Sequence, residues 1–373
     1  MRLPEDELAA LEGASLLRRI PDLDTSLVNF SSNDYLGLSS NAEVKKAYRD
    51  AIENYGAGST ASRLVCGTME PHLNLENSIA KAKGSEAALS FSSGYATSIG
   101  VITSLLSKGD TVILDKLCHA SLIDGARMSG ATIRVYPHNN TEKLESILKS
   151  VTKKANQDSR ILVITESVFS MDGDMAPLDR INKLCKQYDC LLLVDEAHAL
   201  GVIGPTGMGL AEELGIQDQI DFQMGTLGKA AGVAGGYLAT TRVWADLMIN
   251  RSRSFIYSTA PPPAQAAAAS KALEIIQSEQ GSQLRKQLLN NIESFRVISE
   301  IEGSCPSAII PWIVSDSDRA LKLSAELREN GFLVPAIRYP TVPRHTARLR
   351  ITINSHHDET SIKALANHLT SSI

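Results

Sequence analysis

The chain has 373 residues, of which 43% are hydrophobic and 21% charged, and its net charge at pH 7 is −5. A chain of this length exceeds the usual single hydrophobic core, so we expect one large domain and a smaller one. The charge lacks the basic footprint that nucleic-acid binding requires, and no apolar run reaches the roughly 18 residues of a membrane span. The acidic start Met1–Glu7 does not resemble a signal peptide, which favours a cytoplasmic protein.

Short apolar runs alternate with amphipathic stretches through the middle of the chain. The runs Thr111–Leu114, Ile161–Ile164 and Cys190–Val194 predict strands, and residues 141–151 and 178–187 predict helices. This alternation predicts an α/β fold with a mainly parallel sheet flanked by helices. We expect an N-terminal segment over residues 1–45 and the large domain over residues 46–263, with ligands beyond the carboxyl ends of the strands.

The residue composition changes after three consecutive prolines at 261–263. An alanine-rich stretch, Ala264–Gln277, predicts a linking helix. Beyond it, residues 311–314 and 349–353 predict strands, and residues 318–330 predict a helix with Gly331 at its carboxyl cap. Residues 264–373 are therefore expected to hold the linking helix and a small α+β domain.

The five cysteines are scattered and form no CxxC pair, a pattern typical of a reducing compartment. A metal site at Cys185 and Cys190 is the alternative. Because Cys190 opens an apolar run, it fits strand core better, and we expect no metal. The glycine-rich segment 201–209 could suggest nucleotide binding, but it lacks the GK[ST] ending and the dinucleotide spacing.

Three side chains in the middle of the chain carry potential chemistry. Asp195 and His198 directly follow a predicted strand, although a helix N-cap and a hydrogen-bonded core histidine are the alternative readings. Lys229 lies among small and apolar residues, where desolvation would make its amine nucleophilic, unless it is a surface lysine.

The combination points to pyridoxal 5'-phosphate (PLP). This cofactor needs a lysine for its Schiff base, an acid for its ring nitrogen and a phosphate site. Lys229 and Asp195 meet the first two needs. The segment Ser92–Thr97, which contains Gly94 and Tyr95, could form a phosphate-binding helix start.

Ordered motifs along nearly the whole chain carry a family resemblance. They are Asn29–Gly37, Gly56–Arg63, His119–Ser121, Phe169–Asp174, Asp195–His198, Thr226–Lys229, Tyr339–Pro343 and Ala347–Arg350. With these motifs the chain resembles the α-oxoamine synthases, which are fold-type-I PLP enzymes. The resemblance implies that the cofactor is PLP and that the protein is a transferase with this fold.

The resemblance also implies roles for the residues around the cofactor ring. Lys229 would hold PLP and then act as the base that removes the α-proton of the amino acid. Asp195 would pair with the ring nitrogen and His119 would stack on the ring. His198 and Ser170 would steady the phenolic oxygen.

Further roles concern the phosphate and the substrates. Gly94, Tyr95 and Thr226 would line the cofactor and phosphate site. Arg350 would bind the amino-acid carboxylate in a bidentate pair, unless it is a surface arginine.

Three residues are expected on the substrate side of the site. Thr341 and Arg18 would face the acyl-CoA, although the adjacent Arg19 leaves the register of the arginine open. Asn33 lies in a motif near the substrate entrance.

The implied reaction is a decarboxylative condensation of an amino acid with an acyl-CoA or acyl-carrier-protein thioester. The segment Ala336–Pro343 favours L-alanine and a pimeloyl thioester, as in biotin biosynthesis. Glycine C-acetyltransferase, 5-aminolevulinate synthase and serine palmitoyltransferase are alternatives within the family, and a non-catalytic PLP-binding protein is one outside it.

Two further points concern assembly and departures from the family pattern. The resemblance implies a homodimer in which residues near Ser59 and Thr60 reach the neighbouring active site. Ala199, Tyr95 and the pair at 344–345 depart from the expected pattern. None of them removes a catalytic group, but the pair at 344–345 puts the acyl preference in question.

Overall fold

A computed structural model describes residues 3–20, 24–156, 158–302 and 307–371. The strands are β1 (Val28–Asn29), β2 (Ala87–Phe91), β3 (Thr111–Asp115), β4 (Thr132–Tyr136), β5 (Ile161–Glu166), β6 (Leu191–Asp195), β7 (Phe222–Thr226), β8 (Gly236–Thr240), β9 (Ile309–Ser315), β10 (Phe332–Leu333), β11 (Ala336–Ile337) and β12 (Ala347–Thr352). The α-helices are α1 (Pro4–Gly13), α2 (Ala42–Tyr55), α3 (Glu70–Ala82), α4 (Gly94–Leu105), α5 (Ala120–Ser129), α6 (Thr141–Thr152), α7 (Leu178–Gln187), α8 (Leu210–Glu213), α9 (Arg242–Arg251), α10 (Arg253–Ile256), α11 (Pro263–Gln277), α12 (Glu279–Ile298), α13 (Ser317–Glu329) and α14 (Glu359–Ser371). None of these helices is both long enough and apolar enough to cross a membrane.

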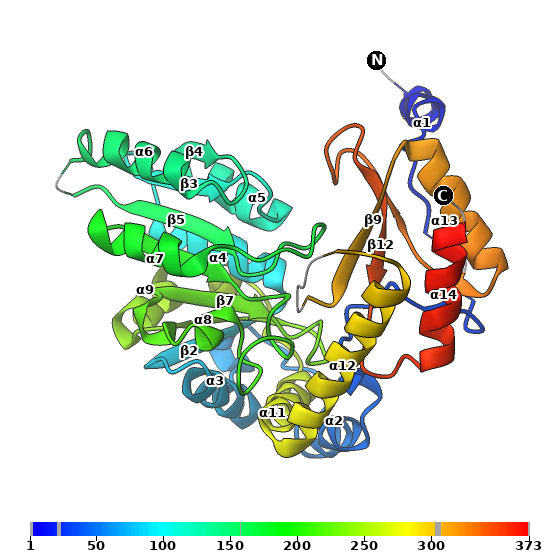
Figure 1. Ribbon diagram of the computed structural model, residues 1–373. Helices are drawn as coiled ribbons and strands as arrows, with labels where there is room; N and C mark the ends of the chain where they lie inside the picture. The colour runs from blue at the N-terminus through cyan, green and yellow to red at the C-terminus, as the bar shows by residue number, and fades with distance from the viewer. Residues whose placement is uncertain (1–2, 21–23, 157, 303–306, 372–373) are drawn as a thin grey trace.

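A seven-stranded sheet forms the larger part of the molecule (Figure 1). Its strand order is β2-β8-β7-β6-β5-β3-β4, and β8 alone runs antiparallel to its neighbours. The predicted strands correspond to β3, β5 and β6, and the predicted helices to α6 and α7. The expectation of a mainly parallel sheet is therefore confirmed.

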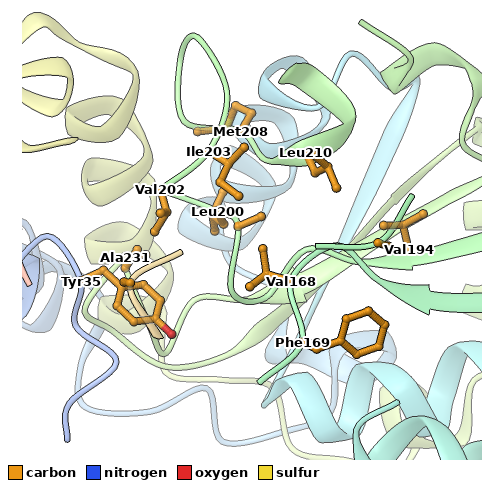
Figure 2. Packing of buried hydrophobic residues seen from close by; sticks show 14 of the residues in the cluster. Tyr35, Val168, Phe169, Val194, Leu200, Val202, Ile203, Met208, Leu210 and Ala231 are labelled. Carbon is orange, nitrogen blue, oxygen red and sulfur yellow. The ribbon is translucent and has the colours of Figure 1, made fainter. Parts of the chain in front are cut away.

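Both faces of this sheet are covered, which explains why its strands read as continuous apolar runs. In β5, Val163 packs into one hydrophobic cluster, while Leu162 and Ile164 pack into another. The first cluster includes side chains of α6, α7 and α11, and the second includes side chains of α4, α5 and α9. Figure 2 shows part of the first cluster, in which the ring of Tyr35 is buried.

The C-terminal part contains a three-stranded antiparallel sheet in the order β11-β12-β9. Figure 1 shows this sheet beside α13 and α14. The predicted linking helix is α11, and α13 ends just before Gly331, whose φ of +86° suits a helix carboxyl cap. The domain boundaries at 45/46 and 263/264 stay a prediction, and the first of them falls inside α2.

The N-terminal segment packs against this C-terminal part. β1 pairs in parallel with β10, and the carbonyl of Phe30 accepts a hydrogen bond from the Thr352 amide at 2.8 Å. The chain after β1 therefore follows the end of β12. This places Asn33 and Tyr35 beside residues more than 300 positions further along the chain.

Candidate active site

Two carboxylates lie side by side at the carboxyl ends of neighbouring strands. Glu166 ends β5, Asp195 ends β6, and the two residues are paired in the sheet register. The Asp195 carboxylate accepts a hydrogen bond from the Ala197 amide at 2.9 Å, but a turn rather than a helix follows. Burial raises the pKa of Asp195, and the charge of Lys229 acts in the opposite direction. The helix N-cap reading of Asp195 is therefore wrong.

Lys229 lies in the turn after β7, close to His198. Its Nζ is 2.5 Å from His198 Nε2. Burial lowers the pKa of Lys229 to about 8, despite the opposing charges of Asp195 and Glu166. Burial and the charge of Lys229 both hold the pKa of His198 well below its usual value. The surface-lysine reading is wrong, and His198 is a buried, hydrogen-bonded histidine that also faces the lysine.

His119 lies at the N-terminal end of α5 and joins this group through Glu166. Its backbone amide donates to Glu166 Oε1 at 2.5 Å, and its Nδ1 accepts from the Ser121 amide at 3.3 Å. Burial and the charge of Asp195 raise the pKa of Glu166 to about 8. Glu166 is not among the residues predicted for the site, although it follows an apolar run just as Asp195 does.

The start of α4 lies close to the end of β7. The Ser93 hydroxyl caps the helix by accepting from the Ala96 amide at 3.0 Å, and Gly94 and Tyr95 are its first two residues. A Cβ on Gly94 would lie 3.3 Å from the Cβ of Thr226, so glycine permits this close approach. The first amides of a helix have no partner within it and attract anions, so this corner can hold a phosphate.

Arg350 reaches the same region from β12. Its Nε donates to the Ser170 carbonyl at 2.7 Å, and its Nη2 donates to Asn33 Oδ1 at 3.0 Å. The side chain is 5% exposed, so the surface-arginine reading is wrong. The structure thus brings Arg350, Asn33 and Ser170 together, with Ser170 contacting Arg350 through its backbone.

A separate cavity of about 620 Å³ lies between the N-terminal segment and β11. Arg18 and Arg19 both line it: Arg18 donates to Thr341 Oγ1 at 3.0 Å, and Arg19 pairs with Glu12, which also lines the cavity, at 3.2 Å. The structure adds Arg338, whose guanidinium donates to the Ser15 carbonyl. Of the two neighbouring arginines, Arg18 is the one in contact with Thr341.

The departures from the family pattern lie around this cavity and around the buried site. The Arg344 guanidinium lies 4.3 Å from the ring centroid of Tyr339, which lines the cavity. Tyr95 is half-exposed, and its hydroxyl donates to Asp124 Oδ2 at 2.7 Å. Ala199 is fully buried. Among the described residues, none of these side chains hydrogen-bonds to Lys229, His198 or Asp195.

Cys185 and Cys190 are buried free thiols, and Cys305 lies outside the described residues. Within the described ranges, no group of three or more His, Cys, Asp or Glu side chains could hold a metal ion. The segment 201–209 packs on the protein itself, since the Thr206 and Met208 amides both donate to the Glu212 carboxylate.

The buried residues fit PLP chemically. A lysine amine with a lowered pKa and a buried carboxylate that acts on it are the groups that PLP needs for its Schiff base and its ring nitrogen. The amides at the start of α4 provide an anion site close to the end of β7.

Comparison with known proteins agrees with this chemistry. A sequence model of the aminotransferase class I and II family matches residues 25–369. The 8-amino-7-oxononanoate synthase of Geobacter sulfurreducens is 45% identical over 341 residues, which cover 90% of this chain and 86% of that protein. The chain belongs to the 8-amino-7-oxononanoate synthase family.

Solved structures extend the likeness to three dimensions. An 8-amino-7-oxononanoate synthase from Francisella tularensis is 30% identical, with a TM-score of 0.79, and the match covers 94% of this chain and 98% of that one. A serine palmitoyltransferase variant from S. paucimobilis, solved with a bound PLP–myriocin aldimine, is 27% identical with a TM-score of 0.91, and the match covers 99% of this chain and 96% of that one. Like the members of this family, the chain is a PLP-dependent acyltransferase of fold type I.

Proposed function

We propose that this enzyme condenses L-alanine with a pimeloyl thioester of coenzyme A or of a carrier protein. The products are 8-amino-7-oxononanoate, carbon dioxide and the free thiol, as a step of biotin biosynthesis. The observation that carries the proposal is the Lys229 amine 2.5 Å from His198, with the Asp195 carboxylate acting on it. This arrangement occurs in a chain 45% identical to a protein named for this reaction.

The buried residues would hold PLP, which supplies an electron sink for negative charge at the α-carbon of alanine. Lys229 would bind it covalently and Asp195 would pair with its ring nitrogen. His119 would lie against the ring, and His198 with Ser170 would bind the phenolic oxygen. The phosphate would lie at the start of α4, at Gly94 and Tyr95, with Thr226 beside it.

Lys229 would act as the base for alanine. A pKa of about 8 leaves roughly a tenth of the amine unprotonated at pH 7, against less than a thousandth at the ordinary value. The unprotonated amine can accept the α-proton. His198 contacts the same nitrogen and would orient it, because a base must lie within hydrogen-bond reach of the proton it removes.

Arg350 would bind the alanine carboxylate until it leaves. The α-carbon forms a bond to the thioester carbonyl carbon, and the carbon–sulfur bond breaks to release the thiol. The bond between the α-carbon and the carboxylate then breaks, carbon dioxide departs, and a proton returns to the α-carbon. A guanidinium fork suits this binding because it holds both carboxylate oxygens and fixes the bond that breaks.

The acyl chain would extend toward the cavity lined by Arg18, Arg338 and Thr341. In the part of the chain that the structure describes, neither Arg18 nor Arg338 has a carboxylate partner within ion-pair distance. Asn33 accepts a hydrogen bond from Arg350 at 3.0 Å, which supports its place near the substrates. The unpaired positive charge favours an acyl group that ends in a carboxylate, as pimeloyl does.

The enzyme would work in the cytoplasm as a homodimer. Ser59 is buried and donates to the Pro261 carbonyl at 2.6 Å, and Thr60 has a φ of +59°. Next to this strained segment, Leu64, Val65 and Tyr257 expose 52%, 78% and 71% of their surface. Apolar side chains exposed this close together support an interface with a second copy.

Two measurements test the proposed function. Lys229→Ala should abolish the PLP adduct that borohydride traps, whereas the surface variant Lys183→Ala should keep it. A panel of alanine, glycine and serine with pimeloyl-, octanoyl- and acetyl-CoA should give turnover with alanine and pimeloyl-CoA. Octanoyl-CoA, which lacks the terminal carboxylate, should react poorly. Turnover with glycine and acetyl-CoA alone would contradict the proposal.

A further inference from the structure

A continuous line of hydrogen bonds joins Lys229 to Arg350. It runs through His198 and through two residues of the N-terminal segment, Tyr35 and Asn33. Lys229 Nζ lies 2.5 Å from His198 Nε2, and His198 Nδ1 lies 2.6 Å from the Tyr35 hydroxyl. That hydroxyl is 3.2 Å from Asn33 Oδ1, which is 3.0 Å from Arg350 Nη2. The line therefore connects the proposed base to the proposed carboxylate-binding residue.

The direction of each bond in this line is set by its arginine end. A guanidinium has only donors, so Asn33 must present its oxygen to Arg350. The Tyr35 hydroxyl donates its one hydrogen to that same oxygen at 3.2 Å, and its own oxygen also accepts a hydrogen bond from Arg350. The Tyr35 oxygen is then left to accept, so His198 Nδ1 must carry a hydrogen and donate it.

The opposite ring nitrogen of His198 follows from this. A neutral imidazole carries one hydrogen, so with Nδ1 protonated its Nε2 is bare. The bare Nε2 faces Lys229 Nζ and accepts a hydrogen bond from the amine. With the other tautomer, an N–H would point at the ammonium form of the lysine and oppose it.

Two properties of Tyr35 suit this position. Its side chain has no exposed surface and is packed in the hydrophobic cluster of Figure 2, so the hydroxyl cannot turn to solvent. Burial raises the pKa of Tyr35 to about 12, although the charge of Arg350 and its hydrogen bond to the phenol act the other way. The phenol therefore keeps its hydrogen throughout the working range of an enzyme.

We propose that, in the PLP-free enzyme, Tyr35 is a positioning residue that holds His198 in the tautomer with hydrogen on Nδ1, so that a bare Nε2 meets the Lys229 amine. Through Asn33, the same hydroxyl supports Arg350. The link to Lys229 stands on the contacts of this chain, and the link to substrate binding rests on the proposed function.

Other charges also act on Lys229 and must stay constant in any test. Asp195 and Glu166 favour its ammonium form, whereas Arg350 opposes it. Removing only the Tyr35 hydroxyl changes none of these charges. The variant Tyr35→Phe also keeps the buried ring and its packing.

The test compares Tyr35→Phe with Tyr237→Phe in the PLP-free and PLP-loaded enzyme. Tyr237 is 1% exposed, and among the described residues its hydroxyl has no hydrogen-bond partner. Tyr237→Phe therefore removes a buried hydroxyl that is not part of the hydrogen-bonded line, and it serves as the control. Nitrogen-15 spectra of histidine-labelled, PLP-free protein should show one His198 tautomer in the wild type and in Tyr237→Phe. Tyr35→Phe should show a mixture. The His198→Gln spectrum identifies the resonance.

Two solution measurements extend the test. In Tyr35→Phe, the pH midpoint for reaction of Lys229 with PLP should fall by about half a unit or more, because the ammonium loses an acceptor. This shift should disappear when His198→Gln is also present. The KM for alanine should rise about fivefold, since Asn33 loses a partner.

An unchanged tautomer and midpoint in Tyr35→Phe, matching Tyr237→Phe, would overturn the proposal. Neither readout needs an acyl donor or turnover. If the tautomer shifts but the enzyme never condenses alanine with pimeloyl-CoA, the proposed function fails and the role of Tyr35 at Lys229 stands.

Discussion

The chemistry of Lys229 is decided by a competition between burial and charge. Two carboxylates, Asp195 and Glu166, favour the ammonium form, yet its pKa is lowered to about 8 because desolvation is the larger effect. His198 adds no positive charge beside the amine, since its own pKa is held well below the usual value. The site therefore keeps a nucleophilic amine beside a neutral imidazole.

We expect the reaction of PLP with the PLP-free enzyme to show this pKa. The rate of imine formation should rise with pH and level off above about 8, whereas a model lysine peptide should level off near 10.4. Between these values the unfolded chain binds a proton that the folded chain does not, so this lysine's contribution to the free energy of unfolding should increase with pH. Stopped-flow absorbance measures the rate, and a plateau above pH 10 would contradict the expectation.

At the scale of the elements, the loop Phe169–Asp174 after β5 lies in close contact with β9 and β12 of the small sheet. Arg350 donates to the Ser170 carbonyl, and Arg348 pairs with Asp172 at 2.6 Å. At Gly173, with a φ of +70°, a Cβ would lie 2.2 Å from the carbonyl oxygen of Ile309 in β9. The large sheet and the small one thus meet through backbone as well as through ion pairs.

Replacing Gly173 by alanine tests the close contact with the Ile309 carbonyl, because the new Cβ would clash with it. Gly84 has a similar φ of +63° but nothing within 4 Å of its would-be Cβ, so Gly84→Ala isolates the strain of the backbone angle. We expect Gly84→Ala to lower the free energy of unfolding by about 1 kcal/mol, and Gly173→Ala by about 3 kcal/mol with lower activity. Urea unfolding of the two variants measures the difference, and equal losses would exclude a role for the Ile309 contact.

At the scale of the whole molecule, the proposed homodimer would form at the surface around residues 59–65 and Tyr257. Ser62 and Thr259 form an isolated bridge, and apolar side chains on either side of it are exposed. The proposed contribution of residues near Ser59 and Thr60 to a neighbouring site would couple assembly to activity. Affinity at such interfaces is concentrated in few large side chains, so a single charge can disrupt them.

We expect Val65→Glu to weaken the homodimer at least tenfold and to reduce activity at low protein concentration. Val243 is exposed to the same extent, 77% against 78%, but lies at the start of α9 and serves as the matched control in Val243→Glu. Sedimentation velocity over a range of concentrations measures the assembly. A wild-type monomer with full activity would rule out the proposed assembly.

Hydrophobic periodicity predicted strands of the large sheet and helices beside it. The positions of Lys229, Asp195 and His198 relative to those strands made them candidate site residues. Periodicity determines buried strands, and the motifs place these residues just after strand ends, where a parallel sheet gathers its ligands. The alternatives to these roles stayed open because one residue type fits a cap, a core or a site equally well. Glu166 was missed for the same reason.

Only the tertiary structure decided which residues share a hydrogen bond. Tyr35 and His198 are 163 positions apart, and Asn33 and Arg350 are 317 apart. No local propensity encodes such pairs, because they depend on β1 pairing with β10 and on the chain after it lying along β12. Burial, which lowers the pKa of Lys229, is likewise a property of the assembled core. The sequence by itself determined the chemical groups, and packing determined their partners and their protonation.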